Sequence, residues 1–140
     1  IVENSNQLNQ GELSSNLQTL DQNELQKIDI DLSKMSATMI YSEVFNMMLS
    51  PEEYENKIIK VKGTFQVYTN PAETEQYFAV IVQDATACCQ QGIEFIWEGT
   101  HTYPDDYPQI GQEITVIGKY IVTTLEDELS YAFLQINEWN

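Results

Sequence analysis

Side chains alternate between apolar and polar along the residues that follow Lys57, and this alternation constrains the fold more than any other feature of the chain. From Ile59 to Val67 every second position is apolar or glycine, and Lys60 and Lys62 lie between them. Since successive side chains of a strand point to opposite faces, this spacing predicts a strand with one buried face.

The same reasoning predicts four more strands. Residues 77–83 form a nearly continuous apolar run, expected in the middle of a sheet. Residues 93–97, 113–123 and 129–139 follow, and a long loop at 99–111 separates the third strand from the fourth. Gly63 and Gly118 lie inside the first and fourth strands, where glycine marks a bulge or a tight bend. Five such strands predict a small closed barrel.

A helix is predicted before the barrel, over residues 36–49, with Ser36 as its cap. Pro51 begins a short helical turn directly after it. Apolar side chains at spacings of three and four predict that one helix face packs on the barrel. The residues expected on that face are Ile40, Tyr41, Val44, Phe45 and Met48.

Residues 1–27 are rich in Asn, Gln, Ser and Glu and are expected to form a flexible polar tether. Residues 28–32 alternate apolar and acidic side chains, which suits an edge strand or an extended arm. We therefore expect one domain over residues 28–140, with the helix at 36–49 as part of it. The fold class is mainly β: a five-stranded barrel preceded by an N-terminal helix and a flexible polar segment.

The charge balance argues against several classes of partner. The chain holds 22 Asp and Glu against 6 Lys and Arg, a formal net charge of −16. Phosphate binding requires a cationic face, so nucleic acid is excluded as a partner, and anionic membrane surfaces are expected to repel the chain. No run reaches the roughly 18 apolar residues of a membrane span. The chain begins with Ile1 rather than Met, so we interpret it as trimmed of a leader. A lipid-anchor segment is one leader of this kind.

The strand pattern resembles the OB-fold, in its anticodon-binding-like branch. The resemblance rests on residues 54–63, on Asp84, on residues 92–95 and on residues 110–118, and it covers about residues 51–139. OB barrels host many tasks, so this likeness implies a fold rather than a function.

A closer resemblance is to uncharacterised small OB-domain proteins of Gram-positive bacteria, often lipid-anchored. It rests on residues 77–80, 84–89, 92–95 and 103–108. It implies an extracytoplasmic protein, secreted or anchored to the cell surface. A more distant likeness, to a permease-partner family with a Cys-Cys pair after its second strand, implies metal handling and a membrane transporter as partner. In that family the Asp follows the cysteines, whereas Asp84 precedes them here.

Cys88 and Cys89 are the two cysteines of the chain and stand side by side at the corner between the second and third strands. Three interpretations remain open. The two can be plain thiols, one buried and one exposed. They can form a vicinal disulfide, strained because adjacent Cα atoms are about 3.8 Å apart, below the usual range of roughly 4.4 to 6.8 Å. They can bind zinc or a similar metal with Asp84, Glu94 or the single His101.

No catalytic motif accompanies these residues, so we expect no enzyme and no catalytic residues. A few aromatic side chains at the strand ends are candidates for a shallow recognition face. These are Trp97, Tyr103, Tyr107, Tyr131 and Trp139.

The sequence therefore predicts a non-enzymatic, extracytoplasmic OB-fold module that binds an unknown protein or small ligand and needs no cofactor. The alternatives are a metal-handling protein with zinc at the Cys88/Cys89 corner and a thiol-redox module.

Overall fold

The computed structural model describes residues 18–84, 86, 89–124 and 128–140. Its helices are α2 (Gln22–Leu25), α3 (Ala37–Leu49) and two short 3-10 turns, η1 (Leu32–Lys34) and η2 (Pro51–Glu53). Its strands are β1 (Ile30–Asp31), β2 (Ile58–Thr69), β3 (Gln76–Gln83), β4 (Gln90–Trp97), β5 (Glu113–Thr124) and β6 (Ser130–Trp139). No helix among the described residues is both long and apolar enough to span a membrane.

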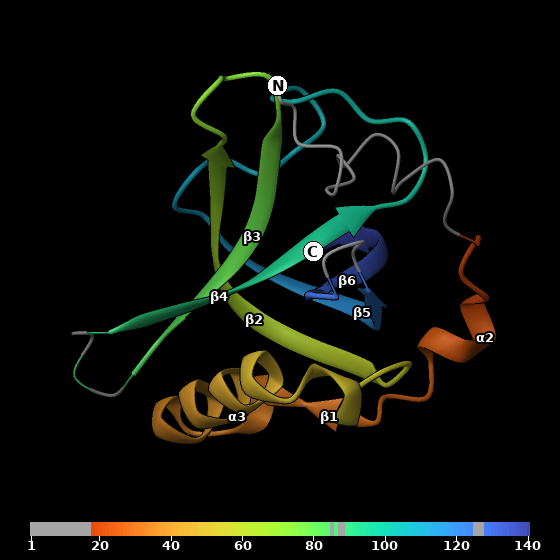
Figure 1. Ribbon diagram of the computed structural model, residues 1–140, viewed down its shortest axis with the longest axis vertical. Coiled ribbons are helices and arrows are strands. Elements are labelled where there is room, and N and C mark those ends of the chain that lie inside the picture. Colours follow the sequence, from red (N-terminus) through yellow and green to blue (C-terminus); the bar gives the residue numbers. More distant parts are fainter. Residues whose placement is uncertain (1–17, 85, 87–88, 125–127) are drawn as a thin grey trace.

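Strands β2 to β6 close into a barrel with the connectivity of an OB-fold (Figure 1). β2, β3 and β4 form an antiparallel meander, β4 then pairs with β6 in parallel, and β6 pairs with β5. The pairing of β2 with β5 closes the barrel. The expected mainly β, OB-fold architecture is confirmed. Strand β1, parallel to the start of β2, confirms the edge strand expected within residues 28–32.

The two interior glycines lie where two backbones approach closely. A Cβ atom on Gly63 would stand 2.4 Å from the carbonyl oxygen of Ile81, and one on Gly118 would stand 2.7 Å from that of Gln135. The β5–β6 register also shifts between Val116 and Gly118, which is the bulge expected there.

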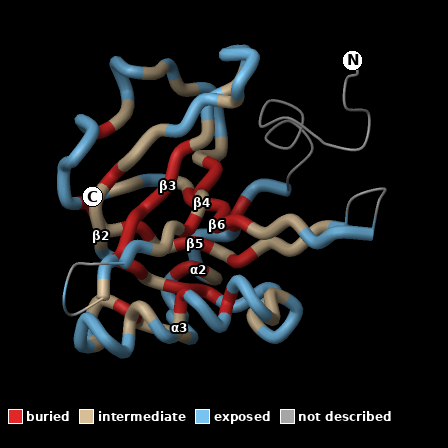
Figure 2. Tube along the Cα trace, turned by 60° about the vertical axis from the view of Figure 1, so that its left-hand side comes forward, coloured by how far each residue is buried: buried red, intermediate tan, exposed pale blue. Residues whose placement is uncertain are grey.

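The inward faces of the five barrel strands form one apolar core, seen as the buried stretches of Figure 2. Helix α3 covers one end of the barrel, where Met47 is buried and its carbonyl accepts a hydrogen bond from Tyr120. The segment between β4 and β5 loops over the opposite side (Figure 1). Its Tyr107 stacks on Phe78 with ring centroids 4.2 Å apart.

Helix α3 begins as expected, with the Ser36 hydroxyl accepting a hydrogen bond from the Met39 N–H. The prediction of its buried face was partly wrong. Val44 and Met47 are the buried residues, whereas Phe45 and Met48 are exposed. The error arises because Val44–Phe45 and Met47–Met48 are neighbouring apolar pairs, and spacing alone does not say which member of each pair faces the barrel.

Residues 18–27 lie against the barrel, although the tether was expected to extend to residue 27. We call this segment the N-terminal strap. Leu20 and Leu25 are buried beside Ile58 and the half-buried Ile117. Burying the two leucines removes their apolar area from water, which favours docking of the strap. The polar composition of the segment did not predict this. Residues 1–17, the rest of the expected tether, lie outside the described residues.

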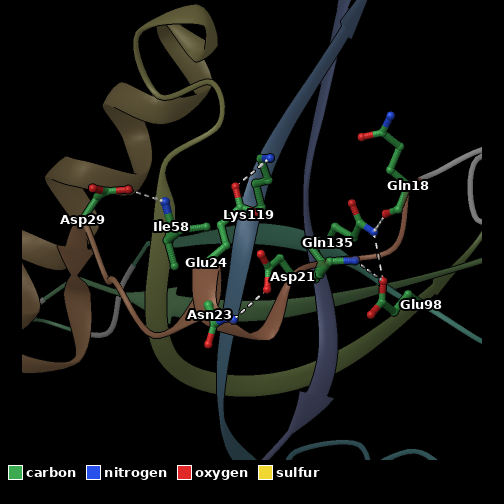
Figure 3. Close-up of polar contacts among 10 residues, drawn as sticks. Gln18, Asp21, Asn23, Glu24, Asp29, Ile58, Glu98, Lys119 and Gln135 are labelled. Atoms are coloured by element: carbon green, nitrogen blue, oxygen red, sulfur yellow. Dashed lines mark hydrogen bonds and ion pairs between the residues drawn. The ribbon is translucent and has the colours of Figure 1, made fainter.

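Polar contacts hold the strap in place (Figure 3). The Leu20 N–H donates to the Glu98 carboxylate at 2.9 Å. The Gln135 side-chain amide donates to both the Gln18 carbonyl, at 2.6 Å, and Glu98, at 3.2 Å. An ion pair of 2.9 Å between Lys119 and Glu24 adds to them. Residues 18–27 are thus joined to the barrel by both apolar and polar contacts.

Candidate functional site

The corner between β3 and β4 is a hairpin end held by Asp84. Its backbone N–H donates to the Cys89 carbonyl at 3.1 Å, and its carboxylate accepts hydrogen bonds from both the N–H and the hydroxyl of Thr86. The Asp84 carboxylate therefore shapes the turn. Cys89 is exposed, and Cys88 lies outside the described residues. The three interpretations of the cysteine pair remain predictions.

The other expected metal ligands lie away from this corner. Glu94 is on β4 and accepts a hydrogen bond from the Tyr131 hydroxyl at 2.6 Å. His101 lies beyond the opposite end of β4, stacked on Trp97 with centroids 3.4 Å apart, and its Nε2 is 2.9 Å from the Glu98 carbonyl. Eight strand residues at about 3.3 Å each separate the two ends of β4, so His101 and Cys89 cannot bind one ion in this arrangement. Across the described ranges, no three His, Cys, Asp or Glu side chains gather as a metal site.

A shallow hollow of about 330 Å³ lies on the outward face of β3 and β4, and we call it the tyrosine hollow. Tyr68 at the end of β2 pairs with Tyr77 at the start of β3, and these rings form one side. Ala79 is paired with Glu94 and Ile81 with Gly92 across the β3–β4 ladder, and these four residues also line the hollow.

Small side chains keep the hollow open. Ala79 presents only a methyl group, and Gly92 presents none. A Cβ atom on Gly92 would stand 2.8 Å from the Ile81 Cδ1 atom, so the Ile81 side chain already reaches over this glycine. The strand alternation places these positions outward because Phe78, Val80 and Ile93 between them belong to the core.

Tyrosine hydroxyls and carboxylates meet around the hollow. The Tyr77 hydroxyl is 3.5 Å from the Glu75 carboxylate. Burial, together with the negative charges of Glu75 and Glu94, raises the pKa of Tyr77 above its usual value. The pKa of Tyr131 is also raised, first by burial and then by Glu94. Both phenols therefore stay protonated at neutral pH and act as hydrogen-bond donors.

No described residue that lines this hollow is Lys or Arg. The sequence has neither Lys nor Arg from Gly63 to Gly118, but it has eight Asp and Glu there. The cationic side chains of β2, Lys60 and Lys62, instead line a polar hollow of about 520 Å³ together with the strap and the end of β6. The tyrosine hollow thus combines aromatic rings with an excess of negative charge.

None of the five aromatic residues expected at a recognition face lines this hollow. Tyr131 donates a hydrogen bond to Glu94 but lines a neighbouring groove, whereas Trp97, Tyr103, Tyr107 and Trp139 pack against the barrel core. Tyr68, which is 51% exposed, and Tyr77 were missed. The sequence pattern could have identified them. Both lie next to the β2–β3 turn, at strand positions whose side chains point away from the core.

Comparisons with known proteins give no family for the chain. No protein-family model matches it, and no curated protein matches it. The resemblance to lipid-anchored OB-domain proteins of Gram-positive bacteria is therefore not supported.

Solved structures do match. One is the crystal structure of the SSB domain of a Synechococcus sp. protein, with 12% sequence identity and a TM-score of 0.36 over 61% of this chain and 93% of that one. The exclusion of nucleic acid as a partner had rested on net charge alone, and it is not retained. At this level of similarity the SSB domain does not assign a ligand to the chain.

Proposed function

We propose that the chain is a non-enzymatic OB-fold binding module, and that the tyrosine hollow takes an organic cation such as an ammonium or guanidinium group. One observation carries this proposal. The rings of Tyr68 and Tyr77 and the carboxylate of Glu94 line the same hollow, and none of the described residues that line it is Lys or Arg.

The physical basis is the attraction of a cation to an aromatic face and to a nearby carboxylate. A cation over an aromatic ring gains about 0.5 to 1 kcal/mol at an exposed site and about 2 kcal/mol where water is excluded. Two neighbouring rings and a carboxylate therefore favour a cation of modest size. The small side chain of Ala79 supports this proposal, because it leaves the ligand room to approach the faces of the two rings.

The test is a titration of the labelled protein with tetramethylammonium chloride, followed by NMR, against sodium chloride at equal ionic strength. We expect saturable shifts at Tyr68, Tyr77 and Glu94. Tyr68→Ala should weaken binding about fivefold, equivalent to about 1 kcal/mol, and Tyr68→Phe should retain it. Met39→Ala, an exposed change on α3, is the matched control.

Two results would overturn this proposal. One is the absence of saturable shifts, or shifts that do not respond to Tyr68→Ala. The other is binding of a short single-stranded oligonucleotide at the same residues without any binding of tetramethylammonium, which would assign the hollow to nucleic acid.

A second candidate function is metal handling or thiol redox at the Cys88/Cys89 corner, with zinc as the ion. It is supported by the exposure of Cys89 and by the backbone hydrogen bond that joins it to Asp84. The test counts thiols and bound metal in protein purified without a chelator. A stoichiometric metal lost in Cys89→Ser supports the metal role, a reducible Cys88–Cys89 bond supports the redox role, and two unreactive thiols without metal exclude both.

The proposed setting is extracytoplasmic, with the protein secreted or anchored by a lipid, and a membrane transporter is one candidate partner. The acidic composition, which suits solubility outside a cell, supports this setting. Fractionation of the source cells, with the protein detected by antibody, tests it directly.

A further inference from the structure

Helix α3 carries an apolar stripe on its exposed side. Tyr41, Phe45, Met48 and Leu49 occur at positions i, i+4, i+7 and i+8, the spacing of one helix face. Phe45 is 43% exposed, Met48 56% and Leu49 65%. Tyr41 is half-buried, and its hydroxyl accepts a hydrogen bond from the Gln91 side chain at 3.3 Å. We call these four residues the α3 stripe; Figure 2 shows how much of the helix surface is exposed.

The stripe lies beside the helix face that stabilises the fold. Val44 and Met47 pack into the barrel core, and they line the same groove as Met48. The one charged residue of α3, Glu43, accepts a hydrogen bond from the Tyr54 hydroxyl. The exposed face therefore carries no charge, although the chain has a net charge of −16. Large exposed apolar patches mark interaction sites, which makes this helix face a candidate docking surface.

A groove runs beside the stripe, between α3, β4 and β6. It has a volume of about 300 Å³, and Met48 belongs to both the stripe and the groove. Its walls combine the apolar side chains of Val44, Met47, Ile93 and Ala132 with polar groups. It exists because β4 and β6 pair only from Phe95 to Trp97, so their earlier residues diverge under the helix. Methionine side chains adapt their shape to an inserted group, which suits a groove of this kind.

The acidic residues next to the α3 stripe indicate the charge of a partner that would bind there. Glu52, Glu53 and Glu55 follow the stripe directly and are exposed, and Glu94 lies at the groove. An apolar stripe with an acidic margin is complementary to a segment with apolar residues on one side and Lys or Arg on the other. A second copy of this chain would bring the same negative charge to the contact, and an anionic membrane would also be repelled. Both are therefore disfavoured.

We propose that the α3 stripe and its groove dock a basic amphipathic helix of a partner protein. The apolar side chains of the partner lie along Phe45, Met48 and Leu49, and one of them enters the groove. Its Lys or Arg side chains face Glu52 and Glu53. This surface is distinct from the tyrosine hollow, except that Gly92 and Glu94 contribute to both cavities.

The probe is a fluorescein-labelled peptide of about 18 residues, enough for about five helical turns, with leucine on one face and lysine on the other. Binding is followed by anisotropy. A peptide of identical composition in scrambled order carries the same charge without an apolar face. We expect the amphipathic peptide to bind at least about tenfold more tightly than the scrambled one, because anchor side chains supply most of the affinity in such contacts.

The matched variants replace exposed apolar residues in two places. The double change Phe45→Ser and Met48→Ser should weaken the amphipathic peptide about tenfold or more. Ile110→Ser, at a residue 57% exposed in the segment between β4 and β5, should leave binding unchanged. Both proteins are checked for unchanged thermal unfolding. Tyr68→Ala should also leave peptide binding intact, which separates this surface from the tyrosine hollow.

Several outcomes would overturn the proposal. Equal binding of the scrambled peptide would show attraction by charge alone. Unchanged binding after the double change would place the peptide elsewhere. Dimerisation that the double change abolishes, seen by sedimentation without any peptide, would assign the stripe to a second copy. Binding to anionic vesicles in preference to the peptide would assign it to a lipid surface.

Discussion

Single glycines decide how closely the strands of this barrel can approach. Gly63 and Gly92 both contact Ile81, but they meet different parts of it. A Cβ atom on Gly63 would lie 2.4 Å from the backbone oxygen of Ile81, whereas one on Gly92 would lie 2.8 Å from the end of its side chain. A side-chain end moves aside easily, but a carbonyl in a β ladder cannot. The same substitution should therefore have different costs at the two positions.

We predict that Gly63→Ala lowers the free energy of unfolding by about 2 to 3 kcal/mol, the range for overpacking against a fixed backbone. Gly92→Ala should change it by less than about 1 kcal/mol, because the Ile81 side chain can change rotamer. Urea denaturation of both variants measures the difference. Equal losses at the two sites would contradict the close approach at Gly63.

At the scale of elements, the N-terminal strap shows why composition is a poor guide to docking. The segment is polar on average, and that average predicted a tether. Two leucines nevertheless dock on the barrel beside Ile58 and Ile117, in addition to the polar contacts. Whether such positions are available depends on strands far along the chain, which no local window of the sequence contains.

We predict that Leu20→Ala destabilises the strap by about 2 kcal/mol, at the lower end for a buried leucine because the site is peripheral. The loss should appear first as faster hydrogen exchange at the Leu20 amide, which donates to Glu98. Ile28→Ala, at a residue 37% exposed, is the control and should cost less than about 0.5 kcal/mol. Unchanged exchange in Leu20→Ala would mean that the polar contacts alone hold the strap.

For the whole molecule, the alternation of apolar residues predicted the barrel well. Each strand has one apolar face that is stable only when buried. Few arrangements of five such strands, with glycines inside two of them, bury every apolar face. The tyrosine hollow was harder to predict, because Tyr68 and Glu94 are far apart in the sequence and meet only through the register of β2, β3 and β4. Net charge was overinterpreted, because it describes the whole chain and cannot exclude a partner at one face.

The charges of the chain do predict how its stability depends on salt concentration. Within the part of the chain that the structure describes, ion pairs join Lys34 to Asp31, Lys62 to Glu113 and Lys119 to Glu24, at 3.8, 3.6 and 2.9 Å. Exposed pairs contribute at most about 1 kcal/mol each. Against them stands the mutual repulsion of a chain with a net charge of −16. Salt weakens both effects, since the screening length falls to about 8 Å at physiological ionic strength.

We expect repulsion to be the larger effect, because the excess negative charges outnumber the pairs several times over. Added sodium chloride should therefore raise the free energy of unfolding by on the order of 1 kcal/mol. Chemical denaturation with urea, which is uncharged, measures this without changing the ionic strength itself. Lys119→Gln separates the contributions: it removes the shortest ion pair and adds one net negative charge, so its stability should depend on salt more steeply. A fall in wild-type stability with salt would mean that the ion pairs outweigh the repulsion.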